Sequence, residues 1–230
     1  MLAKQNQLLR SDRDGVTTLT MNRPDTRNAL SVDLIASLQA EFREIASNTN
    51  IRVVVLSANG PVYCSGHDLN EIRQNQDYEA YEELFTERSK LMLMIGKLPQ
   101  PVVARVQGTA TAAGCQLVAT CDLAVASEKA AFATPGVNIG LFCSTPMVAL
   151  SRNVGRKQAM EMLLTGDVID AEKAQSIGLI NKVCPEKELD EIIDNWCSNL
   201  KSKSPLTIKI GKEAFYQQID LPFRVPPLIS

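Results

Sequence analysis

The chain has 230 residues, 45% of them hydrophobic, which is enough for a substantial buried core and excludes disorder by composition. Its 24 basic and 26 acidic side chains give a formal net charge of −2, which argues against a nucleic-acid partner. No apolar run is long enough to cross a bilayer, so no membrane partner is expected. One histidine and six scattered cysteines without a C-x-x-C pair predict no metal site and reduced, mostly buried thiols.

The first seven residues contain neither an apolar signal core nor an Arg-rich amphipathic stretch. The cytoplasm is therefore the expected location. The mitochondrion is the alternative if a transit peptide is missing from this chain.

Strand and helix patterns alternate along the first part of the chain. Continuous apolar, β-branched runs predict strands that are covered on both faces, and apolar residues at helical spacing after Ser31 predict an amphipathic helix with that serine as N-cap. In chain order we expect a strand at 16–20, a helix from Ser31, a strand at 51–56, a helix at 81–98, a strand at 102–106, a short helix from Gly114 and a strand at 122–126.

From Pro146 onward the pattern is helical, and Gly166 and Gly178 are expected to end two of the helices. The sequence thus predicts an α/β core at 1–145, a helical region at 146–219 and an irregular tail at 220–230. Three prolines rule out a regular helix in that tail. The expected helices span 147–152, 156–164, 170–177, 185–201 and 205–219, with an interruption at 179–183.

Two loops of small residues, at 63–69 and 108–117, each follow a buried apolar strand. Two such loops lying side by side can aim two backbone N–H groups at one point. Main chain alone would then form an oxyanion hole. The sequence therefore predicts a site that holds an enolate-like oxygen.

Several motifs occur in a set order between residues 15 and 217, at 22–30, 64–69, 114–117 with Cys121-Asp122, 135–140, 164–166 and 171–180. They resemble the crotonase (enoyl-CoA hydratase/isomerase) superfamily, and residues 112–117 and 132–146 indicate one subgroup of it. The resemblance implies a spiral of ββα units followed by a helical C-terminal region. It also implies acyl-CoA as substrate, no further cofactor, and a homotrimer or hexamer. Crotonase chains continue past the helix at 205–219, so this chain is expected to be truncated, with weaker assembly.

The resemblance places the two oxyanion N–H groups on His67 and Ala113. The helix that begins near Gly114 would add a favourable dipole there. The residues expected to surround the substrate are Arg27, Ser65, Gly66, Asp68, Leu69, Ala112, Gly114 and Cys143.

Two glutamates that hold and activate water in typical hydratases of the superfamily are missing. Gln116 and Gly136 occupy their positions. An amide cannot accept and return a proton near neutral pH, and glycine has no side chain. Hydration of an enoyl-CoA is therefore not expected.

Several of these side chains allow two interpretations. The His67 imidazole either lines the thioester end or only packs, and Gln116 either orients a ligand or is a buried amide. Asp68 is expected to cap the following helix rather than to act as a catalytic carboxylate. Cys143 lacks a base that would activate it as a nucleophile, and Arg27 is a candidate to meet a CoA phosphate.

The sequence favours an enzyme of lyase or isomerase type that acts on an acyl-CoA through an enolate in fatty acid metabolism. Ser65-Gly66-His67-Asp68 also resembles the methylmalonyl-CoA decarboxylases of the superfamily, and decarboxylation needs an oxyanion hole but no base. The remaining alternatives are a non-catalytic acyl-CoA-binding protein and an assembly partner of active relatives.

Overall fold

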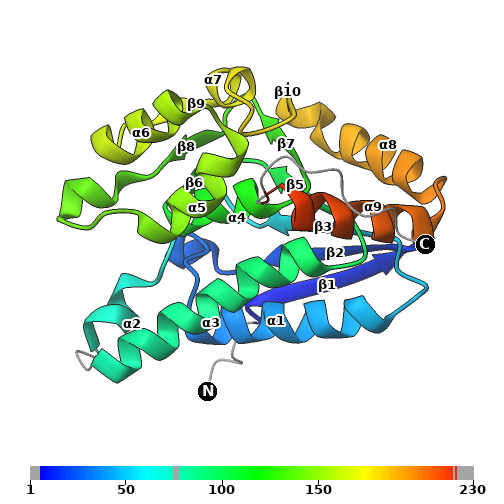
Figure 1. Cartoon of the computed structure of the whole chain (residues 1–230), viewed down its shortest axis with the longest axis horizontal. Coiled ribbons are helices and arrows are strands. Elements are labelled where there is room, and N and C mark those ends of the chain that lie inside the picture. The colour runs from blue at the N-terminus through cyan, green and yellow to red at the C-terminus, as the bar shows by residue number, and fades with distance from the viewer. Residues whose placement is uncertain (1–5, 75–77, 220, 222–230) are drawn as a thin grey trace.

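The computed structural model describes residues 6–74, 78–219 and 221 and consists of two sheets with helices packed around them (Figure 1). The larger sheet has the strand order β1-β2-β3-β5-β7-β10, and the smaller has the order β4-β6-β8-β9. The strands are β1 (Leu8–Arg13), β2 (Val16–Met21), β3 (Val53–Ala58), β4 (Val62–Cys64), β5 (Val102–Val106), β6 (Thr109–Thr111), β7 (Leu123–Ser127), β8 (Ala131–Ala133), β9 (Ile169–Asp170) and β10 (Lys182–Cys184).

The helices lie on both faces of the larger sheet and over the smaller one (Figure 1). No helix in the described ranges is long and apolar enough to cross a membrane. The α-helices are α1 (Val32–Ser47), α2 (Leu69–Gln74), α3 (Tyr78–Lys97), α4 (Ala113–Thr120), α5 (Ser144–Asn153), α6 (Arg156–Thr165), α7 (Ala171–Ser176), α8 (Leu189–Lys201) and α9 (Pro205–Gln218), and the 3-10 helices are η1 (Pro24–Thr26), η2 (Pro135–Ile139) and η3 (Glu186–Glu188).

The chain alternates between the two sheets, and each repeat adds a strand to both. β3, β5 and β7 lie in the larger sheet, and each is followed at once by a short strand of the smaller sheet, β4, β6 or β8. Strands β2, β3, β5, β7 and β10 pair in parallel, as do β4, β6 and β8. Helices then return the chain to the start of the next turn. This is the expected spiral of ββα units.

Alternation along β3 explains its continuous apolar run. Val53 and Val55 face a cluster that α8 covers, whereas Val54 and Leu56 face the main core with α1, α3 and α4. Since both faces are covered, the first four positions of the strand are all apolar. Leu150, Ala159 and Met162, from the helical region, belong to the same main core as the strands.

Some elements differ from the sequence expectation. β4, β6 and β8 have three residues each, too few to show a two-residue period, so parts of the small-residue loops are strands. β1 was not expected either, because it is mostly exposed. The helix expected at 185–201 begins as η3 and becomes α-helical only at Leu189. The expected irregular tail at 220–230 falls, apart from Leu221, outside the described residues.

Candidate functional site

The loop after β4 is fixed along one side by residues 27–30. The Ser65 N–H donates to the Arg27 carbonyl at 3.0 Å, and the Leu30 N–H donates to the Gly66 carbonyl at 2.8 Å. The Asp68 N–H donates back to the Leu30 carbonyl at 3.3 Å. His67 lies between these last two bonds in a parallel bridge with Leu30. Its own N–H therefore faces away from Leu30.

The second loop turns sharply between β6 and α4 at Ala112. This residue has φ 51° and ψ −119°, a combination that a side chain makes unfavourable. The turn is held because the Ala112 N–H donates to the Ala133 carbonyl and the Gln116 N–H donates to the Ala112 carbonyl. Ala113 is the first residue of α4, where a helical N–H has no partner within its own helix. Backbone strain of this kind concentrates at functional sites.

The two loops are in direct contact. A β-carbon added to Gly66, whose φ is +98°, would lie 2.9 Å from Cβ of Ala112 and 3.3 Å from the amide nitrogen of Ala113. A β-carbon on Gly114 would lie 2.1 Å from the Cys64 carbonyl oxygen, closer than any atom pair tolerates. The Thr111 hydroxyl also donates to the Ser65 carbonyl at 3.1 Å. Glycine is thus required at both positions for the loops to meet.

The backbone N–H groups of His67 and Ala113 both lie at this junction, and neither has a hydrogen-bond acceptor among the described residues. Both residues adjoin Gly66, one through the chain and the other through packing. Buried N–H donors normally find an acceptor in the protein or in a bound molecule. The junction can therefore donate two hydrogen bonds from main chain alone.

The positions of the missing glutamates lie on the helix α4 and on the 3-10 helix η2 before α5. Gln116 is 8% exposed, and Gly136 is buried. A β-carbon on Gly136 would lie 2.6 Å from the Leu141 carbonyl oxygen and 2.9 Å from Sγ of Cys143. The loop thus closes onto Gly136, and a longer side chain has no space there. Burial raises the pKa of the Cys143 thiol, which disfavours the thiolate.

Asp68 and Arg27 each act in the local structure. The Asp68 carboxylate accepts a hydrogen bond from the Asn70 N–H at 3.2 Å, so it caps α2, and it pairs with Arg23 at 3.2 Å. The Arg27 side chain is exposed, and the backbone carbonyl of Arg27 accepts the hydrogen bond from the Ser65 N–H. Leu69 is 42% exposed on the first turn of α2.

The His67 imidazole lies against α3. Its ring is 5.9 Å from the Phe85 ring, edge to face, and the guanidinium carbon of Arg88 is 5.5 Å from the same Phe85 ring. Burial, and then the positive charge of Arg88, lower the pKa of His67 to about 3. The imidazole is therefore neutral at physiological pH and a weak base.

Sequence reasoning missed Phe85 and Arg88 as neighbours of the site. A signal was present, because Arg88 shares a helical face with three apolar residues that are buried in the structure. These residues are Leu91, Met92 and Ile95.

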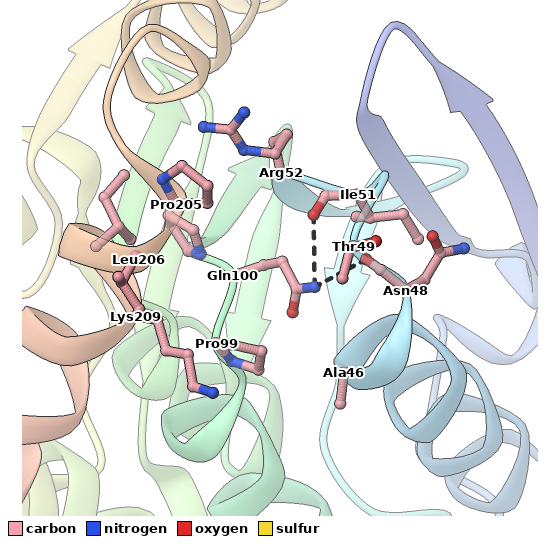
Figure 2. Close-up of a pocket in the computed structure, with 12 residues that line it drawn as sticks. Ala46, Asn48, Thr49, Ile51, Arg52, Pro99, Gln100, Pro205, Leu206 and Lys209 are labelled. Atoms are coloured by element: carbon pink, nitrogen blue, oxygen red, sulfur yellow. Dashed lines mark hydrogen bonds between the residues drawn. The ribbon is translucent and has the colours of Figure 1, made fainter.

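A pocket of about 280 Å³ lies at the N-terminal ends of β3 and β5 (Figure 2). Ile51 and Pro101 line it just before β3 and β5, and the start of α9 forms another wall. Figure 2 shows the Gln100 amide directed at the carbonyls of Asn48 and Ile51, both 3.4 Å away, and it also donates to Ile45. This pocket contains none of the loop residues and is separate from the candidate site.

Metal binding finds no support in the described residues, where no group of three histidine, cysteine, aspartate or glutamate side chains could hold an ion.

Comparisons with known proteins agree on one family. A family model described as enoyl-CoA hydratase/isomerase matches residues 11–224. Human enoyl-CoA hydratase domain-containing protein 3, mitochondrial, is 48% identical over 206 residues, which is 90% of this chain and 68% of the human one. Its crystal structure matches with a TM-score of 0.91 and 46% identity, over 94% of this chain and 86% of that one. The crystal structure of an enoyl-CoA hydratase from Mycobacterium smegmatis gives a TM-score of 0.93 and 50% identity, over 95% and 85%.

Proposed function

The chain belongs to the enoyl-CoA hydratase/isomerase family, and from that premise we propose that it binds acyl-CoA thioesters through a backbone oxyanion hole. The N–H groups of His67 and Ala113 are the two donors. They stabilise the negative charge that develops on the thioester oxygen when an electron pair is left at the α-carbon. No cofactor beyond the coenzyme A thioester is needed for this step.

The contact between the two loops carries this proposal. Gly66 and Gly114 allow the loops to touch, and Ala112 keeps a strained conformation that starts α4 at Ala113. Both N–H groups are free of protein acceptors in the described residues. Fixed donors of this kind need no reorganisation when charge develops, and one donor is typically worth about 3 kcal/mol in the transition state.

The proposed reaction does not use the two-carboxylate mechanism of hydration. Gln116 cannot exchange a proton, and the loop around Gly136 leaves no room for a glutamate. The activity is therefore a lyase or isomerase step of fatty acid or acyl-CoA metabolism that passes through the enolate. Crotonyl-CoA should not lose its enoyl absorbance when the protein is added.

A decarboxylase is the second candidate, and the protonation states around the site favour it. His67 is held neutral as a weak base, and burial raises the pKa of both Cys143 and Cys115, the latter to about 12. Loss of carbon dioxide breaks the bond between the α-carbon and the carboxylate and leaves the electron pair in the enolate without any base. The hole stabilises this enolate, and water then supplies the proton that the α-carbon takes up. If no acyl-CoA is turned over, the same hole makes the chain an acyl-CoA-binding protein or an assembly partner.

The oxyanion hole can be tested with a ligand pair that differs in one oxygen. Butyryl-CoA carries the thioester carbonyl, whereas S-butyl-CoA is the matching thioether without it. We expect tighter binding of the thioester by calorimetry. Ala113→Pro removes one donor at a helix position that tolerates proline and should reduce the preference.

Arg156→Pro, at the first position of α6, is the matched control and should keep the preference. Equal affinity of the wild-type protein for thioester and thioether would contradict the oxyanion hole. A panel of acyl-CoA substrates followed by mass spectrometry then separates the catalytic from the non-catalytic forms of the proposal.

We also propose a mitochondrial location and a homotrimeric or hexameric assembly. The name of the human relative places that protein in mitochondria. Apolar side chains that are 45–61% exposed occur in and after η2, namely Ile139, Leu141 and Phe142, and are available for contacts between subunits. Fractionation of cells that express the full-length protein tests the first proposal, and sedimentation velocity tests the second.

A further inference from the structure

Arg88 on α3 is a buried cation without a hydrogen-bond partner among the residues that the structure describes. Arg88 is 3% exposed, and its Nε, Nη1 and Nη2 atoms have no hydrogen-bond acceptor among the described residues. A guanidinium carries five N–H donors, which point outward within its plane. Leaving such a group buried and unpaired costs several kcal/mol in general. The fold thus gives this buried charge the face of the Phe85 ring but no hydrogen-bond acceptor among the described residues.

The nearby carboxylates do not neutralise Arg88 by contact. Asp68 is already paired with Arg23 and caps α2, and Glu71 accepts a hydrogen bond from the Val32 N–H at 2.9 Å. Both act on Arg88 only through longer-range attraction. Burial is the larger effect and lowers the pKa of Arg88 to about 10, so the side chain is still charged at neutral pH.

The position of this charge connects it to the candidate site. Arg88 lies over the ring of Phe85, and that ring contacts the His67 imidazole. The charge of Arg88 is near enough to His67 to lower its pKa. The main-chain N–H of that same histidine is one of the two proposed oxyanion donors.

We propose that Arg88 binds a carboxylate on the acyl group of the thioester, so that the preferred ligand is a coenzyme A thioester of a dicarboxylic acid. This inference rests on the proposed function, because the oxyanion hole fixes where the thioester lies. The guanidinium offers two parallel N–H donors that match a carboxylate in geometry and charge. A bound carboxylate supplies the acceptors that the fold leaves out.

We assign the Arg88 cation to the acyl end of the ligand because the phosphates of coenzyme A lie far from the thioester. The phosphates of coenzyme A are separated from the thioester by the whole pantetheine arm. With the thioester oxygen at His67, a cation beside the same residue meets a group within a few bonds of the thioester. Free coenzyme A therefore should not depend on Arg88.

The test compares matched acyl chains with and without a terminal carboxylate. Binding of butyryl- and succinyl-CoA, of pentanoyl- and glutaryl-CoA, and of hexanoyl- and adipoyl-CoA is measured by calorimetry with the full chain. We expect at least one carboxylated member to bind about tenfold or more tightly than its partner. Arg88→Met should remove that preference and leave free coenzyme A unchanged. Arg88→Lys should retain part of it, because a point charge remains.

Arg43→Met is the matched control, since Arg43 is exposed on α1 and its guanidinium donates to Gln39 at 3.1 Å. It should keep the preference. A preference that survives Arg88→Met, or no preference in any pair, overturns the inference. A loss of affinity shared by all thioesters and free coenzyme A, with a lower melting temperature, would show a purely structural role and also overturn it. If no thioester binds at all, the proposed function fails first, which distinguishes the two.

Discussion

The two walls of the candidate site are built by different means. The junction of β4, β6 and α4 offers only main-chain groups, and glycine or alanine at 66, 112, 113 and 114 keeps side chains out of the way. The second wall offers side chains, namely the His67 imidazole of the loop after β4 and Phe85 and Arg88 of α3. The neutral imidazole packs on the Phe85 ring, and so does the Arg88 guanidinium, which has no hydrogen-bond partner among the described residues.

This difference separates two parts of the chemistry. Charge stabilisation depends on backbone geometry, which only small residues and close packing maintain. Proton transfer depends on titratable side chains with a suitable pKa, and the positions for it hold Gln116 and Gly136. In the proposed function the N–H groups of His67 and Ala113 supply the first part, whereas the second is absent from those positions. Experiments that disturb one wall at a time can therefore assign a separate role to each.

The largest effect is expected from Gly114→Ala, which breaks the main-chain wall. The new β-carbon would lie 2.1 Å from the Cys64 carbonyl oxygen, so one of the two loops must move. We expect a loss of about 3 kcal/mol in the free energy of unfolding, measured by urea denaturation, together with loss of thioester binding.

Gly211→Ala is the matched control, because nothing lies within 4 Å of a β-carbon added there in α9. It should stabilise the protein by about 0.5–1 kcal/mol through helix propensity. Wild-type stability and binding in Gly114→Ala would show that the loops do not need to touch.

The next effect concerns attempts to restore the hydratase carboxylates. Gly136→Glu should lose about 1–3 kcal/mol of stability, because the loop from Gly136 to Cys143 has no space for the side chain. Gln116→Glu should fold but show no hydration of crotonyl-CoA, since a single carboxylate cannot both deliver water and move the proton. Thermal unfolding and the loss of enoyl absorbance measure the two outcomes.

Gly211→Glu adds the same side chain at an exposed position of α9 and should not lower stability, because glutamate has a higher helix propensity than glycine. Hydration by the double variant Gln116→Glu/Gly136→Glu at an ordinary enzymatic rate would prove that the loop opens easily. The two missing carboxylates would then be the only obstacle to hydration.

Much of this fold could be predicted from the sequence, for reasons seen in particular elements. The run in β3 and the N-cap Ser31 carry their signals locally, and the Ser31 hydroxyl accepts from the Leu34 N–H at 3.2 Å as expected. The family resemblance, which the comparisons confirm, supplied the spiral order. Short strands such as β8 exist only because neighbouring strands pair with them, so no local pattern predicts them.

The candidate site could be predicted only in part. Small residues at 66, 112 and 114 indicated loops that approach each other, but the strain at Ala112 and the closure of the loop over Gly136 are three-dimensional facts. Arg88 was missed because a charged residue on an amphipathic helix is usually solvated. Only the structure shows that its three guanidinium nitrogens are buried with no hydrogen-bond partner in the described parts of the chain.

The smallest effect, and the most direct probe of the side-chain wall, is the titration of His67. It is the only histidine in the chain, so its imidazole gives one set of NMR signals. We expect a pKa near 3 instead of the usual 6.5, because burial and then the charge of Arg88 disfavour the protonated ring. Arg88→Met should raise this pKa, though not to the usual value, since burial is the larger cause.

The same shift determines how stability depends on pH. Between pH 6.5 and 3 the unfolded chain binds a proton at His67 that the folded chain does not, so the free energy of unfolding falls as the pH is lowered through this range. The contribution is at most about 1.4 kcal/mol per pH unit, or about 2 kcal/mol between pH 6.5 and 5. His67→Gln removes the titrating group and should flatten this part of the profile, while the carboxylates titrate in both proteins. A pKa near 6.5 for His67 would mean that the imidazole is hydrated, and the α3 wall would then be open to water rather than closed around Arg88.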